Sequence, residues 1–516
     1  MRRLGLDSQL LLSRKRRLRK ATDCDNAIHQ RLPIPHSDQF QFSHYHTAIL
    51  SNVLPDVSAS AACVRTRAIM EGLLTMTSTG HDSKQYNNNV KYVTTSAAKN
   101  QAPNNFGGFV LPKGATLHHL SPNRTMDFQD LFGNQSNQPN LSPPQPQQPL
   151  DMALFDRFYT EEQFSFRFFH DSPETAMILD MQDLHALRRG RQELVKSYDK
   201  ANPGGDPLAC LSSVVDYIPP VTDTNIVREL SSIHRCDLTL VCSPYELDLL
   251  QHHYDIPKEK LCLAPFFVDE TAIPQDFPLI NVNTIPTQFV FCGGFKHDPN
   301  VDAVHILLNH VWPRLRSEQP HATLHIYGAH CPSQLQATNH HANGVVVHGY
   351  VERLEDIFGP SSEGGPRILL APLRFGAGIK GKIIDAWTYG MPVITTPVGG
   401  EGMTTWQEES GGDASSLRFG GSVASTLDEF CHAATIMATD ATKYHEAQQT
   451  GRVILQELYS AQKNWRIVED RLHQAMASLE ARRERDTMRA ILWHNSNRST
   501  DYFSRWVELK ESSKKK

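Results

Sequence analysis

Short apolar, β-rich runs alternate with segments of helical character along most of the chain, and this alternation constrains the fold more than any other feature. It begins at residue 46, is interrupted by a proline-containing stretch over residues 267–287, and starts again at residue 288. Such alternation is typical of parallel strands joined by crossover helices. Open α/β sheets bind their ligands at the carboxyl ends of the strands, so two such sheets place a ligand cleft between them. The sequence therefore predicts two facing α/β domains.

Composition divides the chain into five expected parts. The Pro/Gln-rich segment 134–149 cannot form a core and is expected to be a surface insertion within the first domain. After residue 440 the pattern is purely helical, which predicts a C-terminal helical extension. The expected parts are a basic, disordered leader (1–43), a first α/β domain (44–266), a linker (267–287), a second α/β domain (288–440) and C-terminal helices (441–516).

Charge and hydropathy argue against several classes of partner. The formal net charge of −5 gives no overall attraction to nucleic acid or to anionic lipid. No run of 18 apolar residues is present, so no membrane span is expected. The histidines and cysteines lack metal-ligand spacing, and no metal is expected. We expect a soluble, cytoplasmic protein. Six basic residues between Arg14 and Lys20 also suit part of an organellar transit peptide, although Asp7, Asp23 and Asp25 are untypical of one.

The stretch with the most chemical information runs from residue 369 to residue 403 and reads LLAPLRFGAGIKGKIIDAWTYGMPVITTPVGGEGM. A buried strand leads into a glycine turn and a helix that opens near Ile379, followed by a second strand and a second glycine turn, Gly399–Gly402. Two glycine-rich loops therefore follow adjacent parallel strands. Glycine lets backbone N–H groups approach a phosphate, and a helix N-terminus favours its negative charge.

The helix after the first glycine turn divides into two faces at 100° per residue. Its apolar face, expected to pack on the sheet, contains Ile379, Ile383, Ala386, Trp387 and Gly390. The opposite face contains Gly378, Gly381, Lys382, Asp385 and Tyr389. Because glycine costs about 1 kcal/mol relative to alanine in a helix, we interpret the two glycines as permitting close approach by a ligand, with lysine near phosphate and aspartate near hydroxyls. The alternative is a surface ion pair between Lys382 and Asp385.

Three further groups of polar residues follow predicted strands. Asp183, His185 and Arg188 come after AMILDM, where they would either position an acceptor and assist a leaving diphosphate, or form a helix N-cap with surface neighbours. Lys296 follows Gly293-Gly294 and would contact phosphate or lie in a solvated loop. Ser58, Ser60 and Arg65 would face the acceptor or a donor phosphate, or mark a helix start.

These motifs resemble those of the GT-B-fold glycosyltransferases of the family-4 type, the glycosyl transferases group 1 enzymes. FCGGFKHDPNVDAV is similar to the entry strand of their C-terminal domain, and GAGIKGKIIDAWTYGMPVITTPVGGEGM to their phosphate loop, acidic helix and following turn. MILDMQDLHALR and RELSSIHRCDLTLVCSPYE resemble strands of their N-terminal domain. The resemblance covers roughly residues 45–455 and is loose before residue 150. It implies an α/β, GT-B architecture of two facing Rossmann-like domains, an N-terminal acceptor domain (44–266) and a C-terminal donor-binding domain (288–440).

The resemblance also implies roles for particular residues. Lys380 or Lys382 would contact the diphosphate, and Asp385 stands at the second acid of the E-x7-E motif, which usually holds the nucleotide ribose. Two positions depart from the family: Ala377 replaces the first acid, and Gln182 replaces a frequent histidine, with His185 three residues on. The implied donor site comprises Gly376, Gly378, Lys380, Lys382, Asp385, Gly399, Gly400, Glu401, Gly402 and Lys296, and the implied catalytic residues are Asp183, His185 and Arg188.

The sequence thus predicts a glycosyltransferase that uses a nucleotide sugar as substrate and needs no cofactor. The resemblance implies a metal-independent reaction that retains anomeric configuration. A noncatalytic sugar-nucleotide-binding protein is the alternative that Ala377 and Gln182 keep open. A C-terminal stripe of Tyr502, Phe503, Trp506 and Leu509 is more typical of a docking surface than of a lipid anchor. The donor sugar, the acceptor and the oligomeric state do not follow from the sequence.

Overall fold

The computed structural model describes residues 45–54, 61–77, 88–95, 111–121, 125–132, 149–278, 280–282, 285–337, 343–404 and 418–513. Contacts group residues 44–516 into one unit, to which the following description applies. The predicted leader, Ser58, Ser60 and nearly all of the 134–149 insertion lie outside the described residues. No helix among the described residues has the length and apolar character to cross a membrane.

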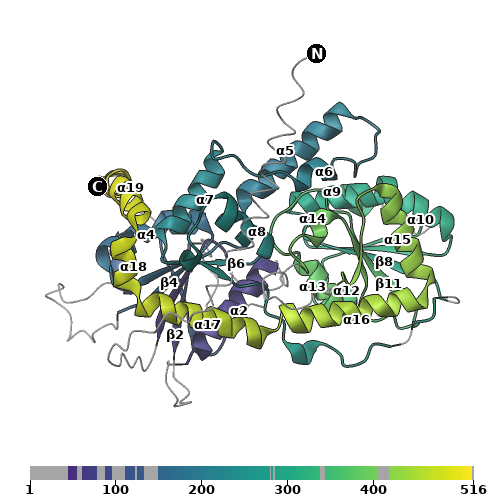
Figure 1. Ribbon diagram of the computed structural model, residues 1–516, viewed down its shortest axis with the longest axis horizontal. Coiled ribbons are helices and arrows are strands. Elements are labelled where there is room, and N and C mark those ends of the chain that lie inside the picture. Colours follow the sequence, from purple (N-terminus) through teal and green to yellow (C-terminus); the bar gives the residue numbers. More distant parts are fainter. Residues whose placement is uncertain are drawn as a thin grey trace, which may run out of the picture. The chain divides into compact units, whose positions relative to one another are not determined.

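Two parallel sheets form the framework (Figure 1). The first has the order β3-β2-β1-β4-β5-β6-β7 and the second the order β10-β9-β8-β11-β12-β13. The strands of the first sheet are β1 (His46–Ser51), β2 (Asn89–Thr94), β3 (Ala115–His119), β4 (Met152–Asp156), β5 (Ala176–Asp180), β6 (Leu238–Val241) and β7 (Leu261–Leu263). Those of the second are β8 (Gln288–Cys292), β9 (Thr323–Tyr327), β10 (Val345–Gly349), β11 (Arg367–Ala371), β12 (Val393–Thr395) and β13 (Gly421–Val423).

Helices connect these strands and cover the sheets. With the first sheet come α2 (Ala61–Thr75), α3 (Thr125–Phe132), α4 (Phe158–Asp171), α5 (His185–Ala201), α6 (Leu211–Val215), α7 (Thr224–Arg235) and α8 (Pro244–Asp248). With the second come α9 (Asp298–Ile306), α10 (Trp312–Glu318), α11 (Ser333–Ala337), α12 (Leu354–Phe358), α13 (Gly381–Thr388), α14 (Pro397–Gly400), α15 (Leu427–Thr439) and α16 (Ala441–Leu458). The chain ends with α17 (Ala461–Ala477), α18 (Leu479–Arg485) and α19 (Thr487–Ser513).

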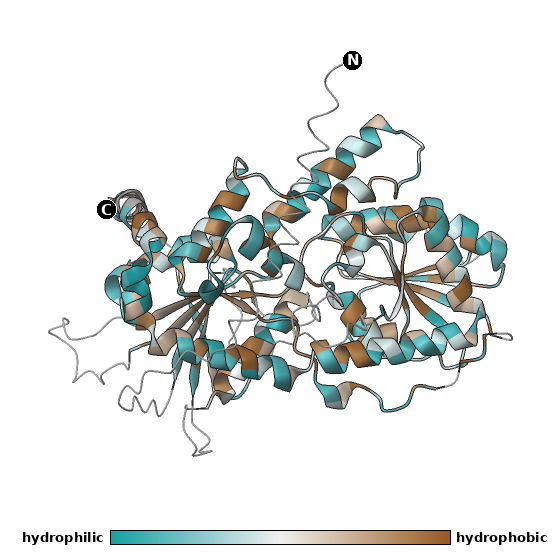
Figure 2. Ribbon diagram, in the orientation of Figure 1, coloured by the Kyte–Doolittle hydropathy of each residue, from teal (hydrophilic) through white to brown (hydrophobic). Residues whose placement is uncertain are grey.

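Strands that read as continuous apolar runs are buried on both faces, as parallel sheets require. Every residue of β4, β5 and β11 is buried, and Figure 2 shows hydrophobic strands inside more hydrophilic helices. Clusters of buried side chains join the first sheet to α4, α5 and α7 on one face and to α2 and α17 on the other. The second sheet packs against α9, α10 and α15 on one face and α13 and α16 on the other. The predicted α/β, GT-B architecture is confirmed.

Helices α5 and α6 also contribute to the core of the second domain. Val195 of α5 and Val214 of α6 belong to the same buried cluster as Phe291 of β8. Near these residues Arg374, which follows β11, pairs with Asp199 of α5 at 2.6 Å. The two sheets are therefore linked by an apolar and ionic interface, and α5 is the element that provides most of it.

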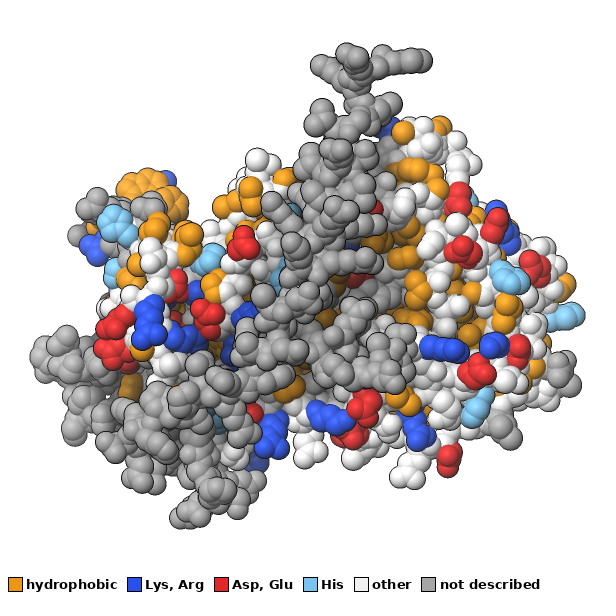
Figure 3. All heavy atoms as spheres, in the orientation of Figure 1, with side chains coloured by type: hydrophobic (Ala, Val, Ile, Leu, Met, Phe, Trp, Pro, Cys, Tyr) orange, Lys and Arg blue, Asp and Glu red, His pale blue; other side chains and the backbone are white. Residues whose placement is uncertain are grey.

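The C-terminal helices return to the first sheet, and α19 carries the predicted aromatic stripe. Trp493, in the first half of α19, stacks on Phe169 of α4. Further along the helix Phe503, Trp506 and Leu509 are 63%, 54% and 70% exposed, whereas the side chain of Tyr502 lies outside the described residues. Figure 3 shows hydrophobic side chains gathered at this end of the molecule. Phe503, Trp506 and Leu509 are therefore exposed for the most part, and the role of the stripe as a docking surface stays a prediction.

Candidate functional site

The first side of the candidate site follows β5, where Asp183 is held between two basic side chains. Asp183 Oδ1 lies 3.2 Å from His185 Nε2, and Oδ2 accepts a hydrogen bond from Arg188. Burial disfavours ionisation of Asp183, but Arg188 and the hydrogen bond from His185 outweigh it and hold the pKa of this carboxyl below its usual range. The three predicted residues thus form a single charged group.

The N-cap interpretation of Asp183 is wrong. The N-cap of α5 is Leu184, which makes no side-chain capping bond. Its first amides, His185 N and Ala186 N, donate instead to the carboxylate of Glu229 on α7 at 2.7 and 2.9 Å. Because a distant acid caps the helix, Asp183 remains directed at His185 and Arg188.

The second side follows β8 and contains Lys382 of α13. Lys382 Nζ donates to Asn300 Oδ1 at 2.5 Å and lies 4.5 Å from the ring centroid of Phe291. Burial lowers the pKa of Lys382 to about 8, and burial raises the pKa of Asp385, one turn along the helix, to about 7. The surface ion-pair alternative does not hold, because both side chains are half-buried and Lys382 bonds to Asn300.

His297, in the loop that leads into α9, connects the two sides electrostatically. The surrounding protein lowers its pKa by reducing its hydration; Arg188 and Lys382 lower it further, whereas Asp183 raises it. Arg157, which follows β4 and has a left-handed φ of 72°, also lowers the pKa of His297. Charged residues of both domains therefore act on His297, and three of them, Arg157, Arg188 and Lys382, are cations. Such a setting favours a diphosphate.

The glycines of the first loop face protein. A Cβ on Gly378, whose φ is +66°, would lie 3.0 Å from Asp183 Cβ, and one on Gly381 would lie 2.5 Å from Ala61 Cβ. Gly378 N donates to Glu246 Oε1 of α8 at 2.8 Å. Close approach of the first domain, rather than of a ligand, accounts for these two glycines.

Two predicted phosphate contacts also point elsewhere. Lys380 Nζ donates to the carbonyl of Gly378 at 2.6 Å within its own loop. Glu401 forms a bidentate ion pair with Arg191 of α5, with both N–O distances 2.7 Å. Lys380 therefore lies beside the acids Glu401 and Glu246, whereas Lys382 bonds to the neutral amide of Asn300. Of the two predicted lysines, Lys382 is the better candidate for a phosphate contact.

The remaining predicted loop residues have mainly structural contacts. Gly399 N donates to Thr396 Oγ1, and Gly400 N to the Thr396 carbonyl. Gly402, with a φ of +70°, packs against Ser243 of the first domain. The carbonyl of Gly376 accepts a hydrogen bond from Arg191. Lys296 is exposed in the loop after β8.

Both departures from the family have a structural reason. Ala377 packs against the apolar cluster of the first domain, where a carboxylate would lose its hydration. Gln182 Nε2 donates to Asp180 Oδ2 at 2.9 Å and to Asp156 Oδ1 at 3.2 Å. Each side chain therefore fits the groups that face it.

Arg65 has no access to a phosphate. Its side chain and that of Asp180 are both 1% exposed, and the two form an ion pair at 2.8 Å. Arg65 also donates to the carbonyls of Ala264 and Pro265. The phosphate interpretation of Arg65 is therefore wrong.

Several residues of the site were missed. Arg157 directly follows a predicted strand, and the rule that ligands bind at the carboxyl ends of strands would have found it. Arg191 and Glu246 carry no such signal, because each acts through a residue more than 100 positions away in the sequence.

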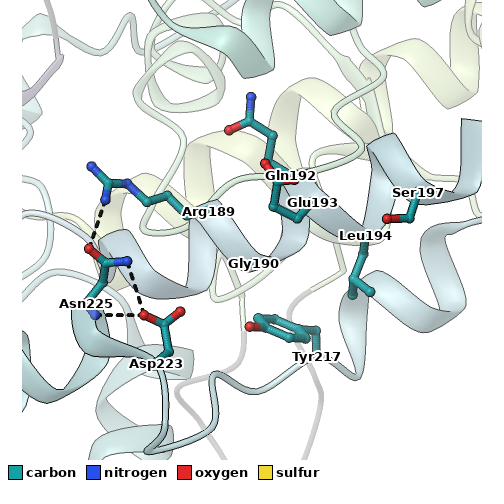
Figure 4. A pocket seen from close by; sticks show the side chains of 9 residues that line it. All are labelled: Arg189, Gly190, Gln192, Glu193, Leu194, Ser197, Tyr217, Asp223 and Asn225. Atoms are coloured by element: carbon teal, nitrogen blue, oxygen red, sulfur yellow. Dashed lines mark hydrogen bonds between the residues drawn. The ribbon is translucent and has the colours of Figure 1, made fainter. Parts of the chain in front are cut away.

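A hollow at the surface of the first domain lies outside this site. It has a volume of about 610 Å³ and is bounded by α5, Tyr217 and the start of α7 (Figure 4). Arg189, Asn225 and Asp223 form a hydrogen-bonded row along one edge. Arg189 lines this hollow, whereas Arg191 and Val195 of the same helix face the second domain.

Comparisons with known proteins agree with this architecture. Residues 286–412 match the family model described as "Glycosyl transferases group 1". No curated protein matches the sequence. The chain is similar to sucrose-phosphate synthase from Thermosynechococcus elongatus, with 12% identity, a TM-score of 0.55 and an overlap of 84% of this chain and 100% of the other.

Two further structures are similar. TarM from S. aureus shares 9% identity at a TM-score of 0.52 over 83% of this chain and 98% of its own. HepE from Anabaena, solved with UDP and glucose, shares 10% at a TM-score of 0.50 over 84% of this chain and 100% of its own. The chain therefore has the GT-B fold of glycosyltransferases, and residues 286–412 carry the sequence of the glycosyl transferases group 1 family.

Proposed function

We propose that the protein transfers a sugar from a nucleotide-sugar donor to an acceptor, without a metal and with retention of anomeric configuration. The observation that carries the proposal is the close approach of the two domains at the glycine loop before Lys382. A Cβ on Gly378 would lie 3.0 Å from Asp183 Cβ, and the charges of Lys382, Asp183 and Arg188 all act on His297. In GT-B folds the ends of the two sheets meet there, and the group 1 match covers the second side.

In the proposed reaction the side chains of the two domains have different roles. The ammonium of Lys382 and the guanidinium of Arg188 stabilise the negative charge that develops on the departing nucleoside diphosphate. Asp385, one turn beyond Lys382, accepts hydrogen bonds from the ribose hydroxyls. Asp183 fixes the orientation of His185, which contacts the acceptor hydroxyl. The first domain excludes water, so the acceptor rather than solvent receives the sugar.

Nucleotide release from UDP-, GDP-, ADP- and dTDP-sugars, with thermal shift on the same samples, tests the proposal. We expect one nucleotide to be released, and the matching donor to raise the melting temperature. A thermal shift without release from any donor, in the presence of mixed acceptors, would favour the noncatalytic binding protein. No shift with any donor would contradict the location of the donor site.

The dependence of nucleotide affinity on alkaline pH provides a second test. Because the pKa of Lys382 is lowered to about 8, its ammonium is present below that pH and is lost as the pH rises through it. We expect the dissociation constant of the bound nucleoside diphosphate to rise about tenfold per pH unit above pH 8. In Lys382→Arg this rise with pH should disappear, because the guanidinium stays protonated. Titration calorimetry between pH 6.5 and 9.5 measures the dissociation constant of the wild-type and variant proteins. An identical rise in Lys382→Arg would show that Lys382 is not the titrating group.

A further inference from the structure

Arg191 of α5 is buried at the interface between the two domains. Its side chain is 0% exposed, and all five of its N–H donors are used. Nε donates to the carbonyl of Val214 at 3.1 Å and one Nη atom to that of Val215 at 3.4 Å, which fixes the guanidinium to its own domain. The remaining donors reach Gly376 O at 3.0 Å and both oxygens of Glu401 at 2.7 Å.

The two partners of Arg191 in the second domain belong to different glycine loops. Gly376 lies in the loop after β11, which leads into the helix of Lys382. Glu401 follows α14, in the loop after β12. One side chain of the first domain thus holds both loops that border the proposed donor site.

Glu246 adds a second link to the first loop. Its Oε1 accepts hydrogen bonds from Gly378 N at 2.8 Å and from Leu184 N at 3.1 Å. The segment Gly376–Gly378 is therefore bonded to the first domain through both its carbonyl and its amide groups. Since Leu184 precedes the helix that carries His185 and Arg188, the same contact joins the two sides of the site.

Separation of the domains would leave these groups unsatisfied. The Glu401 side chain is 8% exposed and both of its oxygens accept hydrogen bonds from Arg191, so loss of Arg191 leaves a poorly hydrated carboxylate in the loop. An unpaired charge of this kind is costly, and the loop would rearrange to hydrate it. The conformation of both loops is consequently coupled to docking of α5.

We propose that Arg191 is a positioning residue for donor binding, which completes the phosphate-binding side of the site by holding the Gly376 and Glu401 loops from the opposite domain. The proposal rests on the proposed function for the identity of the ligand. It predicts that donor affinity depends on a residue outside the matched 286–412 segment.

A double-mutant cycle tests the inference. Arg191→Met, Glu401→Gln and the double variant are compared for binding of UDP, GDP, ADP and dTDP by calorimetry. Arg191→Met should weaken the nucleotide that binds the wild-type protein about tenfold, and the double variant should be little weaker than either single one. Arg189→Met is the matched control, because Arg189 lies on the same helix, is exposed, and bonds to Asn225. Additive effects, or affinity equal to that of the control, would overturn the inference.

Hydrogen exchange separates this inference from the proposed function. Without any ligand, Arg191→Met should speed amide exchange in residues 376–378 and 399–402 relative to Arg189→Met, with less change in β4 and β5. If the wild-type protein binds none of the four nucleotides, the proposed function fails, while faster exchange still supports the positioning role. Unchanged exchange in both loops contradicts that role. Should Arg191→Met fail to fold, Arg191→Lys, which keeps the charge but makes fewer hydrogen bonds, is expected to show the same pattern more weakly.

Discussion

Lys382→Ala is expected to lower kcat/KM for sugar transfer by about 100- to 1,000-fold, the range seen when one preorganised group that stabilises developing charge is removed. The ammonium of Lys382 is held between Asn300 and Phe291 at the end of β8, with no carboxylate bonded to it. When a phosphate oxygen replaces the neutral amide oxygen of Asn300, the ammonium of Lys382 gains a negatively charged partner. The benefit is largest when charge has moved onto the diphosphate, so kcat should fall more than KM rises.

Initial rates of nucleotide release measure this effect. Lys443→Ala is the control, because Lys443 is exposed on α16 and pairs only with Glu446 one turn away. It should retain full activity. If Lys382→Ala retained more than a third of the wild-type kcat/KM, the assignment of Lys382 to the diphosphate would be wrong, and Arg188 would become the main candidate.

The strands could be predicted because burial on both faces of a parallel sheet requires continuous apolar runs. The apolar runs that the alternating pattern predicts as strands, from HTAILSNV (46–53) to MPVITT (391–396), coincide with β1–β12. β13 was missed, because Gly421–Val423 has no apolar run and is defined only by its pairing with β12. The helix after β13 begins at Leu427, where the side chain of the N-cap residue Thr426 accepts a hydrogen bond from Glu429 N.

The candidate site could be predicted only in part, because a residue type does not reveal what it faces. The ligand interpretation of Gly378 and Gly381 was wrong, because the atoms that come close to them belong to Asp183 and Ala61. Likewise Glu401 fits a loop that binds phosphates, yet its carboxylate is used by Arg191. These contacts join segments far apart in the chain, and local periodicity contains no information about them.

Arg65 illustrates the same limit with the largest expected effect on stability. Arg65→Met should lower the free energy of unfolding by about 3–5 kcal/mol, the usual cost of removing one partner from a buried ion pair. The substitution leaves Asp180, at 1% exposure, with a hydrogen bond from Gln182, and it removes the Arg65 donors from the carbonyls of Ala264 and Pro265. Neither the Asp180 carboxylate nor the two carbonyls become hydrated in the folded state.

Urea unfolding of a matched pair of variants checks this expectation. Arg67 lies two residues along α2, forms an exposed pair with Glu71, and should cost less than about 1 kcal/mol when changed to methionine. Asp180→Asn combined with Arg65→Met should restore part of the loss, because the buried carboxylate is then removed. If instead Arg65→Met unfolded at the same urea concentration as Arg67→Met but bound nucleotide more weakly, Arg65 would be a ligand contact after all. A loss confined to stability assigns Arg65 to holding α2 against β5 and the strand end after β7, and so to the shape of the acceptor side rather than to its chemistry.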